Sequence, residues 1–547
     1  MNTLLSRVAT PVLARPLSLR AATRAVEPGR HGNDWRSSVI PTLAWICFGI
    51  LTLGLAPVAM AEVDAAAVAK ASDAVAAKPA AVVVTPVAET TAAESPAPKA
   101  AAPEEAATET PSEERAPADA AESPKPTEAP AAGKSPAKAR LLFDGKSLAG
   151  WTNPYEWGTV EVVEGEIHLT ADKKFFLMTE QEFYDYEFEG EVKLPEGVSN
   201  SGFMARGQVE PNNVFGYQAE ADPTDRRWSG GLYDERRRQW LNPLWKASEA
   251  QDAFDRNRWN RYRIRCVGHH LQFFVNDVPT TDYFDPVDLH GRIGIQHHGE
   301  KGQTYRFRNM TVKELGRHEW KPLFNSDIAK QEVPEGEVIP GFRSVGGGAW
   351  TVVDGILQGR ASSEANEPNG LLYSTKQYTD GTYRIVYRFH KGDSGLFVRS
   401  AITDSKPFIK GVQCEVDGSD QVGGLYQTGG KGWVAQPLNY LEANFPPDRR
   451  DVVRKNWEKA RQGLSLGDKL KPDASDAKEP ASIEEAPWQT MVVNVKGKRV
   501  VTHLNDCLAA DCVIDDLVDS GVIALQLHGN QDMEIDFKSI EILQPAK

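Results

Sequence analysis

Short segments in which apolar and polar residues alternate run through most of the chain after its first quarter. Apolar side chains occupy every second position in EFEGEVKL (187–194), RYRIRCVG (261–268), LQFFVND (271–277) and YRFRNMTVKEL (305–315). A period of two is typical of half-buried β-strands. Turn sequences rich in Gly, Asn and Pro separate the segments, and long helical patterns are nearly absent. The pattern predicts an all-β chain of antiparallel β-sandwich (jelly-roll) domains.

The second half of the chain repeats the first. Matching blocks follow one another in the same order: NSGFMAR (200–206) and DSGLFVR (393–399), GYQAEAD (216–222) and GVQCEVD (411–417), GGLY (230–233 and 423–426), GRIGIQHHG (291–299) and GVIALQLHG (521–529). A period of roughly 200 residues indicates two complete domains, since solenoid units span about 20–50 residues. We expect copy one at 139–317 and copy two at 318–547, each long enough to bury its own core.

Copy two carries an insertion at about 440–486. Tyr426 and Trp488, which belong to matching blocks, are 62 residues apart, against 26 for their counterparts in copy one. Within the insertion, RRDVVRKNWEKARQG (449–463) predicts a helix.

The first 138 residues differ in composition from the repeats. An Arg-rich leader, the apolar run LAWICFGILTLGLA (43–56) and Ala59-Met60-Ala61 predict a cleaved signal peptide over 1–61. The alternative is a membrane anchor, although a spanning helix needs about 20 apolar residues. Residues 62–138 are rich in Ala, Pro and Glu, which predicts a disordered linker. We therefore expect an exported protein (periplasmic, cell-surface or secreted), with association with the cell envelope left open.

Charge and cysteine content narrow the functional classes. A formal net charge of −14 argues against nucleic acid as a partner. Cys266 and Cys414 lie in strand-like runs, which favours buried thiols, and no cysteine spacing fits a zinc site. Cys507 and Cys512 flank a short predicted turn (CLAADC), so a disulfide and two free thiols are both open in an exported chain.

A row of polar residues recurs in both copies. In YQAEAD, Gln218, Glu220 and Asp222 share one face of the predicted strand, opposite the apolar residues between them. Such side chains cost several kcal/mol in a dry core without partners, so we expect them on a wet face or in a buried network. Copy two keeps the row as Gln413, Glu415 and Asp417.

Copy one contains four further motifs: LLFDGKSLAGWT (141–152), VVEGEI (162–167), GGLYDE (230–235) and WNRYRIRCVGHHLQFFVNDV (259–278). With NSGFMAR, GYQAEAD and GRIGIQHHG, they resemble the 3-keto-disaccharide hydrolase family over about 140–316, and more loosely over 320–545. The resemblance implies a concanavalin-like jelly roll and a glycoside or oligosaccharide substrate. It further implies cleavage of glycosides oxidised to a ketone at C3, by hydrolysis or by elimination and hydration.

Two departures from the family pattern concern the site. Many relatives read GYE-x-Q where this chain has Gln218 and Glu220, so the acid and the amide are exchanged. Copy two replaces YDERRR (233–238) with YQTGGK (426–431), which makes it the expected degenerate copy.

The implied chemistry selects candidate residues. A C3 ketone acidifies the C2 proton, so elimination needs a general base, whereas hydrolysis needs a carboxylate or a metal-bound water. Glu220 and His298 are the predicted catalytic residues, because a carboxylate in a groove and a histidine both titrate near neutrality. The predicted substrate-binding residues are Arg206, Gln218, Asp222, Tyr233, Glu235, Arg236 and Gln296, with Arg399, Gln413, Glu415, Tyr426 and His528 in copy two.

Structural interpretations of these residues stay open. His298 could cap the turn before Gly299, and Glu220 could pair with Arg206. No cofactor or catalytic metal is predicted, although Asp222 and Asp225 leave a structural calcium ion open.

Two other functions compete with the enzyme: a non-catalytic carbohydrate-binding module, and a structural protein of the cell envelope. Fold alone does not separate the three. Glu220 and His298 in one groove would favour the enzyme.

Overall fold

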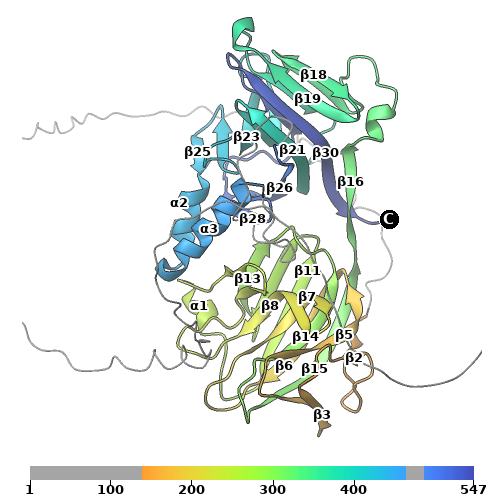
Figure 1. The fold of residues 1–547 in the computed structure, drawn as a ribbon, viewed down its shortest axis with the longest axis vertical. Coiled ribbons are helices and arrows are strands. Elements are labelled where there is room, and N and C mark those ends of the chain that lie inside the picture. The colour runs from red at the N-terminus through yellow and green to blue at the C-terminus, as the bar shows by residue number, and fades with distance from the viewer. Residues whose placement is uncertain (1–137, 464–485) are drawn as a thin grey trace, which may run out of the picture. The chain divides into compact units, whose positions relative to one another are not determined.

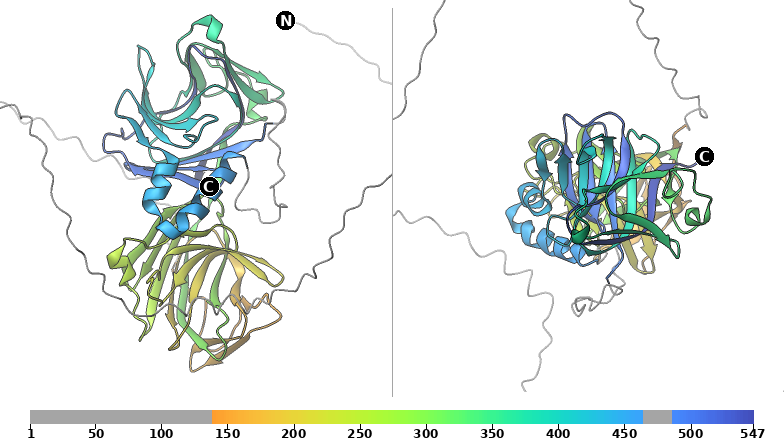
Figure 2. Two further views of the ribbon diagram at one scale, coloured as in Figure 1. Left: turned by 60° about the vertical axis from the view of Figure 1, so that its left-hand side comes forward. Right: turned by 90° about the horizontal axis from the view of Figure 1, so that it is seen from above.

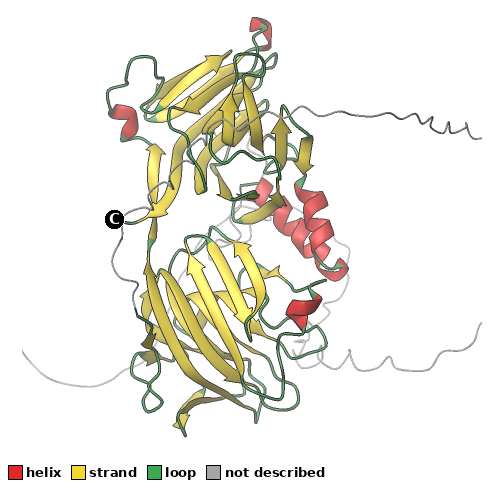
Figure 3. Ribbon diagram, turned by 180° about the vertical axis from the view of Figure 1, so that it is seen from behind, coloured by secondary structure: helices red, strands yellow, loops and turns green. Residues whose placement is uncertain are grey.

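The computed structural model describes residues 138–463 and 486–547. The predicted signal peptide and almost all of the predicted linker lie outside the described residues. All described residues belong to one compact unit. It consists of two tandem β-sandwiches, in which strands far outnumber helices (Figures 1 and 3).

Copy one is built from two antiparallel sheets. The eight-stranded sheet has the order β13 (Val278–Phe284), β12 (His270–Val275), β11 (Asn260–Val267), β6 (Asp185–Lys193), β15 (Thr304–Gly316), β4 (Glu166–Thr170), β3 (Thr159–Val163), with β1 (Arg140–Leu141) also paired to β15. The seven-stranded sheet has the order β10 (Gln239–Asn242), β9 (Leu232–Glu235), β8 (Asn213–Ala221), β7 (Ser201–Glu210), β14 (Gly291–His297), β5 (Phe175–Phe183), β2 (Trp151–Thr152).

Copy two repeats this topology. Its eight-stranded sheet has the order β18 (Ala349–Val353), β19 (Ile356–Ala361), β30 (Met533–Pro545), β21 (Gly381–Lys391), β26 (Gln489–Lys496), β27 (Arg499–Leu504), β28 (Cys507–Val513), with β16 (His318–Phe324) also paired to β30. Its seven-stranded sheet has the order β17 (Phe342–Gly346), β20 (Gly370–Ser374), β29 (Val522–Leu527), β22 (Ser394–Ile402), β23 (Ile409–Val416), β24 (Leu425–Thr428), β25 (Gly432–Ala435). The two tandem jelly-roll sandwiches confirm the predicted fold class.

Helices are few and short among the described residues: α1 (Ser248–Gln251), α2 (Pro437–Asn444), α3 (Arg450–Arg461), and the 3-10 turns η1 (Ile328–Lys330), η2 (Ser363–Ala365) and η3 (Pro447–Arg449). Within the described ranges, none is long and apolar enough to cross a membrane. The helix predicted at 449–463 is present as α3.

The helical insertion of copy two packs against strand β28 and also approaches copy one (Figure 2). Trp457 anchors α3 because its side chain is completely buried in the core of copy two. Asn505 Nδ2 donates a 2.7 Å hydrogen bond to the carbonyl oxygen of Ala460 and so secures the end of the helix.

Direct contacts join the two copies. Arg238 Nη1 donates to the carbonyl oxygen of Asp506 at 2.8 Å, and Arg499 Nη2 donates to that of Asp282 at 3.0 Å. Leu508 of β28 packs into the core of copy one. The insertion is thereby held beside the seven-stranded sheet that carries the polar row.

The four cysteines among the described residues, Cys266, Cys414, Cys507 and Cys512, are free thiols. Cys507 and Cys512 lie on one strand, β28, rather than on either side of a turn. Five residues of extended chain separate their Cα atoms by about 16 Å, whereas a disulfide needs less than about 7 Å. The alternative of a disulfide is therefore wrong for this conformation.

Candidate functional site

Gln218 and Glu220 project from β8 on the outer face of the seven-stranded sheet. Tyr217 and Ala219 point the other way, into the core, as the period of two predicts. Both polar side chains are nevertheless buried, with 1% and 5% of their surface exposed. Glu220 Oε1 accepts a 2.6 Å hydrogen bond from Asn200 Nδ2, and Oε2 accepts one of 3.0 Å from Gln218 Nε2.

Gly202 of β7 leaves room for an amide pair that spans two strand spacings. Gln218 Nε2 lies 3.1 Å from Gln296 Oε1, and Gln296 Nε2 donates back to Gln218 Oε1 at 3.2 Å. Gly202 is directly opposite Glu220 in the register. A Cβ atom there would come within 2.6 Å of Gln218 Nε2. A side chain at this position would therefore displace the pair.

His298 follows β14 and is held by a carboxylate behind it. Its Nδ1 lies 2.8 Å from Glu300 Oε1, and the other oxygen of Glu300 accepts a hydrogen bond from the Tyr305 hydroxyl. Burial opposes ionisation of Glu300, but these two hydrogen bonds hold the pKa of Glu300 below its ordinary value. An ionised Glu300 favours a proton on Nδ1 of His298, which leaves Nε2 for chemistry.

Glu220 and His298 line one polar pocket. It encloses about 550 Å³ of empty space, open solvent included. Four predicted substrate-binding residues also line it: Gln218, Tyr233, Glu235 and Gln296. The structure thus brings together the residues on which the enzymatic interpretation depends.

The environment of Glu220 brings the pKa of its carboxyl group close to neutral pH. Burial is the main cause and raises the pKa of Glu220 to about 7, with a smaller upward contribution from the charge of Asp222. The Asn200 hydrogen bond and the charge of His298 act in the opposite direction. A carboxyl group with such a pKa can exchange a proton at physiological pH.

The expectation that Arg206 and Arg399 bind substrate is wrong. Arg206 is completely buried, and its guanidinium donates to the carbonyl oxygens of Tyr184, Gly268 and Asp288. In copy two, Arg399 is buried in the same way. Arg206 stands at an irregularity of β7 with φ of +51°, so the face on which it points does not follow from strand alternation. Its ion pair is with Asp185, 3.4 Å away, and not with Glu220.

Two further predicted residues do not line the pocket. Asp222 is buried and holds Arg226, whose Nη2 lies 2.9 Å from Asp222 Oδ2. Arg226 itself lines the pocket, so Asp222 acts one layer behind it. Arg236 lies exposed on the turn between β9 and β10 with φ of +58°.

The other two arginines of the DERRR segment form a buried ion-pair network. Arg237 pairs with Asp234 at 2.8 Å, and Arg238 pairs with Asp234 at 2.6 Å and Asp285 at 2.9 Å. This segment is therefore a β-hairpin with a charged interior, and of its five residues only Glu235 lines the polar pocket.

Copy two keeps the amide pair and changes its surroundings. Gln413 Nε2 lies 3.0 Å from Gln526 Oε1 and 3.2 Å from Glu415 Oε2. Burial, followed by the neighbouring carboxyl group of Asp393, raises the pKa of Glu415. Tyr426 packs edge-on against Trp433, as Tyr233 packs on Trp240 in copy one.

The histidine of copy two lacks the carboxylate that supports His298. His528 Nδ1 is 3.1 Å from the carbonyl oxygen of Gly529. Asn530 stands two residues after His528, where copy one has Glu300. Copy one therefore has the more complete arrangement of titratable groups.

Sequence reasoning missed several lining residues: Lys174, Asn200, Arg226, Gln239 and Arg449. Lys174 Nζ lies 2.6 Å from Glu235 Oε1, which neutralises that carboxylate. Asn200 opens the NSGFMAR block, so the repeat itself could have indicated it. Arg449 belongs to η3 in the insertion of copy two, and no signal in the sequence connects it with the pocket.

Among residues 138–463 and 486–547, no group of three or more His, Cys, Asp or Glu side chains could hold a metal ion. Asp222, one of the two residues considered for calcium, is occupied by Arg226 and by the backbone N–H of Thr224.

Comparison with known proteins identifies the domain. The model of a family described as 3-keto-alpha-glucoside-1,2-lyase-like matches residues 138–313 and again 319–543. No curated protein matches the chain.

Solved structures of low identity match a part of the chain. A protein from Parabacteroides distasonis, provisionally assigned as a glycosyl hydrolase, is 16% identical and covers 32% of this chain and 94% of its own, with a TM-score of 0.25. The carbohydrate-binding module CBM66 from Bacillus subtilis is 16% identical, with 30% and 96% covered and a TM-score of 0.24. A Bacillus subtilis protein of unknown function with a galectin-like fold is 11% identical, with 33% and 96% covered and a TM-score of 0.26.

Proposed function

Because the chain belongs to the 3-keto-alpha-glucoside-1,2-lyase-like family, we propose that it cleaves glycosides oxidised to a ketone at C3, and that copy one carries the activity. The observation that carries this proposal is a buried carboxyl group, Glu220, in one polar pocket with a carboxylate-supported histidine, His298. A base with a pKa near the working pH combines a large ionised fraction with useful basicity.

In the proposed reaction, the carboxylate of Glu220 removes the proton on C2, which the C3 ketone acidifies. The electron pair forms an enolate and then the C1–C2 double bond as the bond between C1 and the glycosidic oxygen breaks. Protonated His298 gives its Nε2 proton to the departing oxygen, so an alcohol leaves. Addition of water across the double bond then yields the free 3-keto sugar.

In this scheme, the remaining pocket residues stabilise the negative charge of the enolate and orient the carboxylate of Glu220. Lys174 and Tyr233 line the pocket and offer N–H and O–H donors to the C3 oxygen as it becomes an enolate. The Gln218–Gln296 pair fixes the position of the Glu220 carboxylate from one side, and Asn200 fixes it from the other.

A pure binding module would use exposed aromatic faces. Trp240 lines the pocket and packs edge-on against Trp228, and the two side chains are only 8% and 7% exposed. The guanidinium of Arg226 lies 5.2 Å from the ring centre of Trp228 and 5.6 Å from that of Trp240. Because Arg226 already lies over both rings, these tryptophans offer a poor stacking platform, which favours the enzyme over the binding module.

The test uses a 4-nitrophenyl 3-keto-α-glucoside and its C2-deuterated form with the full chain. We expect nitrophenolate release that slows when C2 carries deuterium, because C2–H cleavage belongs to the elimination. Release without an isotope effect would favour direct hydrolysis. No release at any enzyme concentration would refute the enzymatic proposal and leave the binding or structural role.

The proposal includes export, which rests on the sequence of residues 1–61 alone. An exported enzyme would meet its oxidised glycosides outside the cytoplasm. If the apolar run at 43–56 is not cleaved off, the alternative is a chain that stays associated with the cell envelope.

A further inference from the structure

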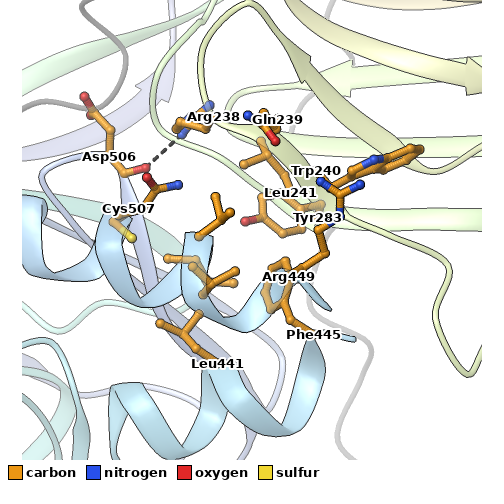
Figure 4. A pocket seen from close by; sticks show the side chains of 14 residues that line it. Arg238, Gln239, Trp240, Leu241, Tyr283, Leu441, Phe445, Arg449, Asp506 and Cys507 are labelled. Carbon is orange, nitrogen blue, oxygen red and sulfur yellow. Dashed lines mark hydrogen bonds between the residues drawn. The ribbon is translucent and has the colours of Figure 1, made fainter. Parts of the chain in front are cut away.

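A second cavity, apolar in character, adjoins the polar pocket of copy one. Gln239, Trp240 and Arg449 line both, so the two spaces are neighbours. The second cavity contains about 550 Å³ of empty space, open solvent included. Its apolar walls are Leu241 and Tyr283 from copy one and, from copy two, Leu441 of α2, Phe445 directly after α2 and Val453 of α3 (Figure 4).

The charged side chain of Arg238 in the wall of this cavity is already engaged. Its guanidinium bonds Asp234, Asp285 and the carbonyl oxygen of Asp506, the last contact drawn in Figure 4. A polar sugar residue would lose its water here and find mostly hydrocarbon, which is costly without replacement hydrogen bonds. The cavity therefore suits an apolar group, and Trp240, Tyr283 and Phe445 give it aromatic walls.

Arg449 stands where the polar and the apolar space meet. Its Nε is buried and makes no hydrogen bond within the described residues; the nearest carboxylate oxygen, on Asp448, is 3.6 Å away. A buried N–H without a partner costs free energy that a ligand oxygen would recover. An oxygen between a sugar and an apolar group would lie at this junction.

We propose that the substrate is a 3-keto-glycoside with an apolar, aromatic aglycone. The sugar occupies the polar pocket, the aglycone occupies the apolar cavity, and Arg449 donates to the glycosidic oxygen between them. The inference rests on the proposed function for the sugar part. It also gives the insertion of copy two a role, because that insertion completes the substrate site of copy one.

The test compares 2-phenylethyl and ethyl 3-keto-α-glucoside, whose leaving alcohols are similar in acidity, so that the difference between them reports on the aglycone. Burying a phenyl group should raise kcat/KM for the phenylethyl compound roughly 10- to 50-fold over the ethyl compound. Val452→Trp should reduce this ratio to below about threefold, because Val452 lines the cavity and is 37% exposed, so a larger side chain there can fill the space.

Lys459→Trp is the matched control, since Lys459 is exposed on the same helix and does not line the cavity. It should leave the ratio unchanged. Val453→Phe fills the cavity from a neighbouring position and serves if Val452→Trp fails to fold by melting curve. Equal kcat/KM for the two substrates in the unmodified chain would overturn the inference while the proposed function stands.

Binding measurements test the aglycone site independently of the proposed reaction. Calorimetry with the full chain carrying Glu220→Gln should show the phenylethyl compound binding at least tenfold more tightly than the ethyl compound. If the unmodified chain cleaves neither compound but this preference is present, the proposed function fails and the aglycone site stands. If both compounds bind equally weakly, the aglycone site is refuted.

Discussion

Asn200 donates a 2.6 Å hydrogen bond to the carboxylate of Glu220. In copy two, Asp393 stands in the place of Asn200, and its carboxyl group raises the pKa of Glu415 further than burial alone. In copy one, the amide of Asn200 donates a hydrogen bond that favours the ionised form of Glu220. In copy two, the acid Asp393 stands at that position and disfavours the ionised form of Glu415. This difference is the electrostatic reason to assign the activity to copy one.

Glu220→Gln should reduce turnover of a 3-keto-glycoside at least 100-fold, because the amide keeps the shape of the side chain but cannot accept the C2 proton. Glu415→Gln in copy two is the matched control and should leave turnover unchanged. Both are measured by aglycone release in the full chain. Equal losses in the two variants would show that the copies share the work.

Stability should depend on pH through Glu220. Its pKa is raised from 4.5 in the unfolded chain to about 7 in the folded one. The stability it contributes is therefore complete below pH 4.5 and is lost as pH rises to about 7. Between pH 5 and pH 8, the unmodified chain should lose roughly 2–3 kcal/mol more unfolding free energy than Glu220→Gln. Urea denaturation at both pH values measures the free energy of unfolding. An equal change between the two pH values in both proteins would contradict the raised pKa of Glu220.

Glu300→Gln should lower kcat roughly 10- to 100-fold with little change in KM, because it removes the charge that orients His298 without touching the sugar pocket wall. Glu182→Gln is a matched control: His290 Nδ1 lies 3.0 Å from Glu182 Oε2 in a similar pair on the exposed surface. Steady-state kinetics on both variants test the role of the pair. A rise in KM alone would mean that Glu300 serves binding rather than proton transfer.

Gly202→Ala should cost both stability and activity. Its Cβ would approach Gln218 Nε2 to 2.6 Å and the carbonyl oxygen of Ala219 to 2.7 Å, and such overpacking costs typically about 1–3 kcal/mol. Gly395→Ala in copy two meets Gln413 in the same way and should cost stability alone. Thermal melts and turnover on both variants distinguish the structural effect from the loss of the Glu220 support.

If the chain is exported as proposed, its mature form should begin at Glu62, because Ala59-Met60-Ala61 has the small residues of a cleavage site. Expression in a secreting bacterial host followed by mass spectrometry of the N-terminus checks this. A full-length chain in the membrane fraction would instead support the anchor. The residues concerned lie outside the described part of the structure.

The direction of a side chain was predictable from the sequence within regular strands, but not where a strand is irregular. Alternation in YQAEAD correctly placed Gln218 and Glu220 opposite the core, because a regular strand has a fixed period of two. The same rule failed for Arg206, since an irregularity of β7 with a left-handed backbone turns its side chain away from the pocket. For Cys507 and Cys512, the segment between them continues as a strand, and only its pairing with β27 decides that.

The sequence by itself determined the tandem organisation and the sandwich fold, because strand alternation and the repeated blocks can be read directly along the chain. It also singled out Glu220 and His298, which the structure places in one pocket. Tertiary structure alone decided which groups surround that pair. Lys174 pairs with Glu235 from 61 residues away, and Arg449 comes from an insertion more than 200 residues after β8. Such neighbours depend on how sheets and helices pack against one another, and no spacing in a single chain records that.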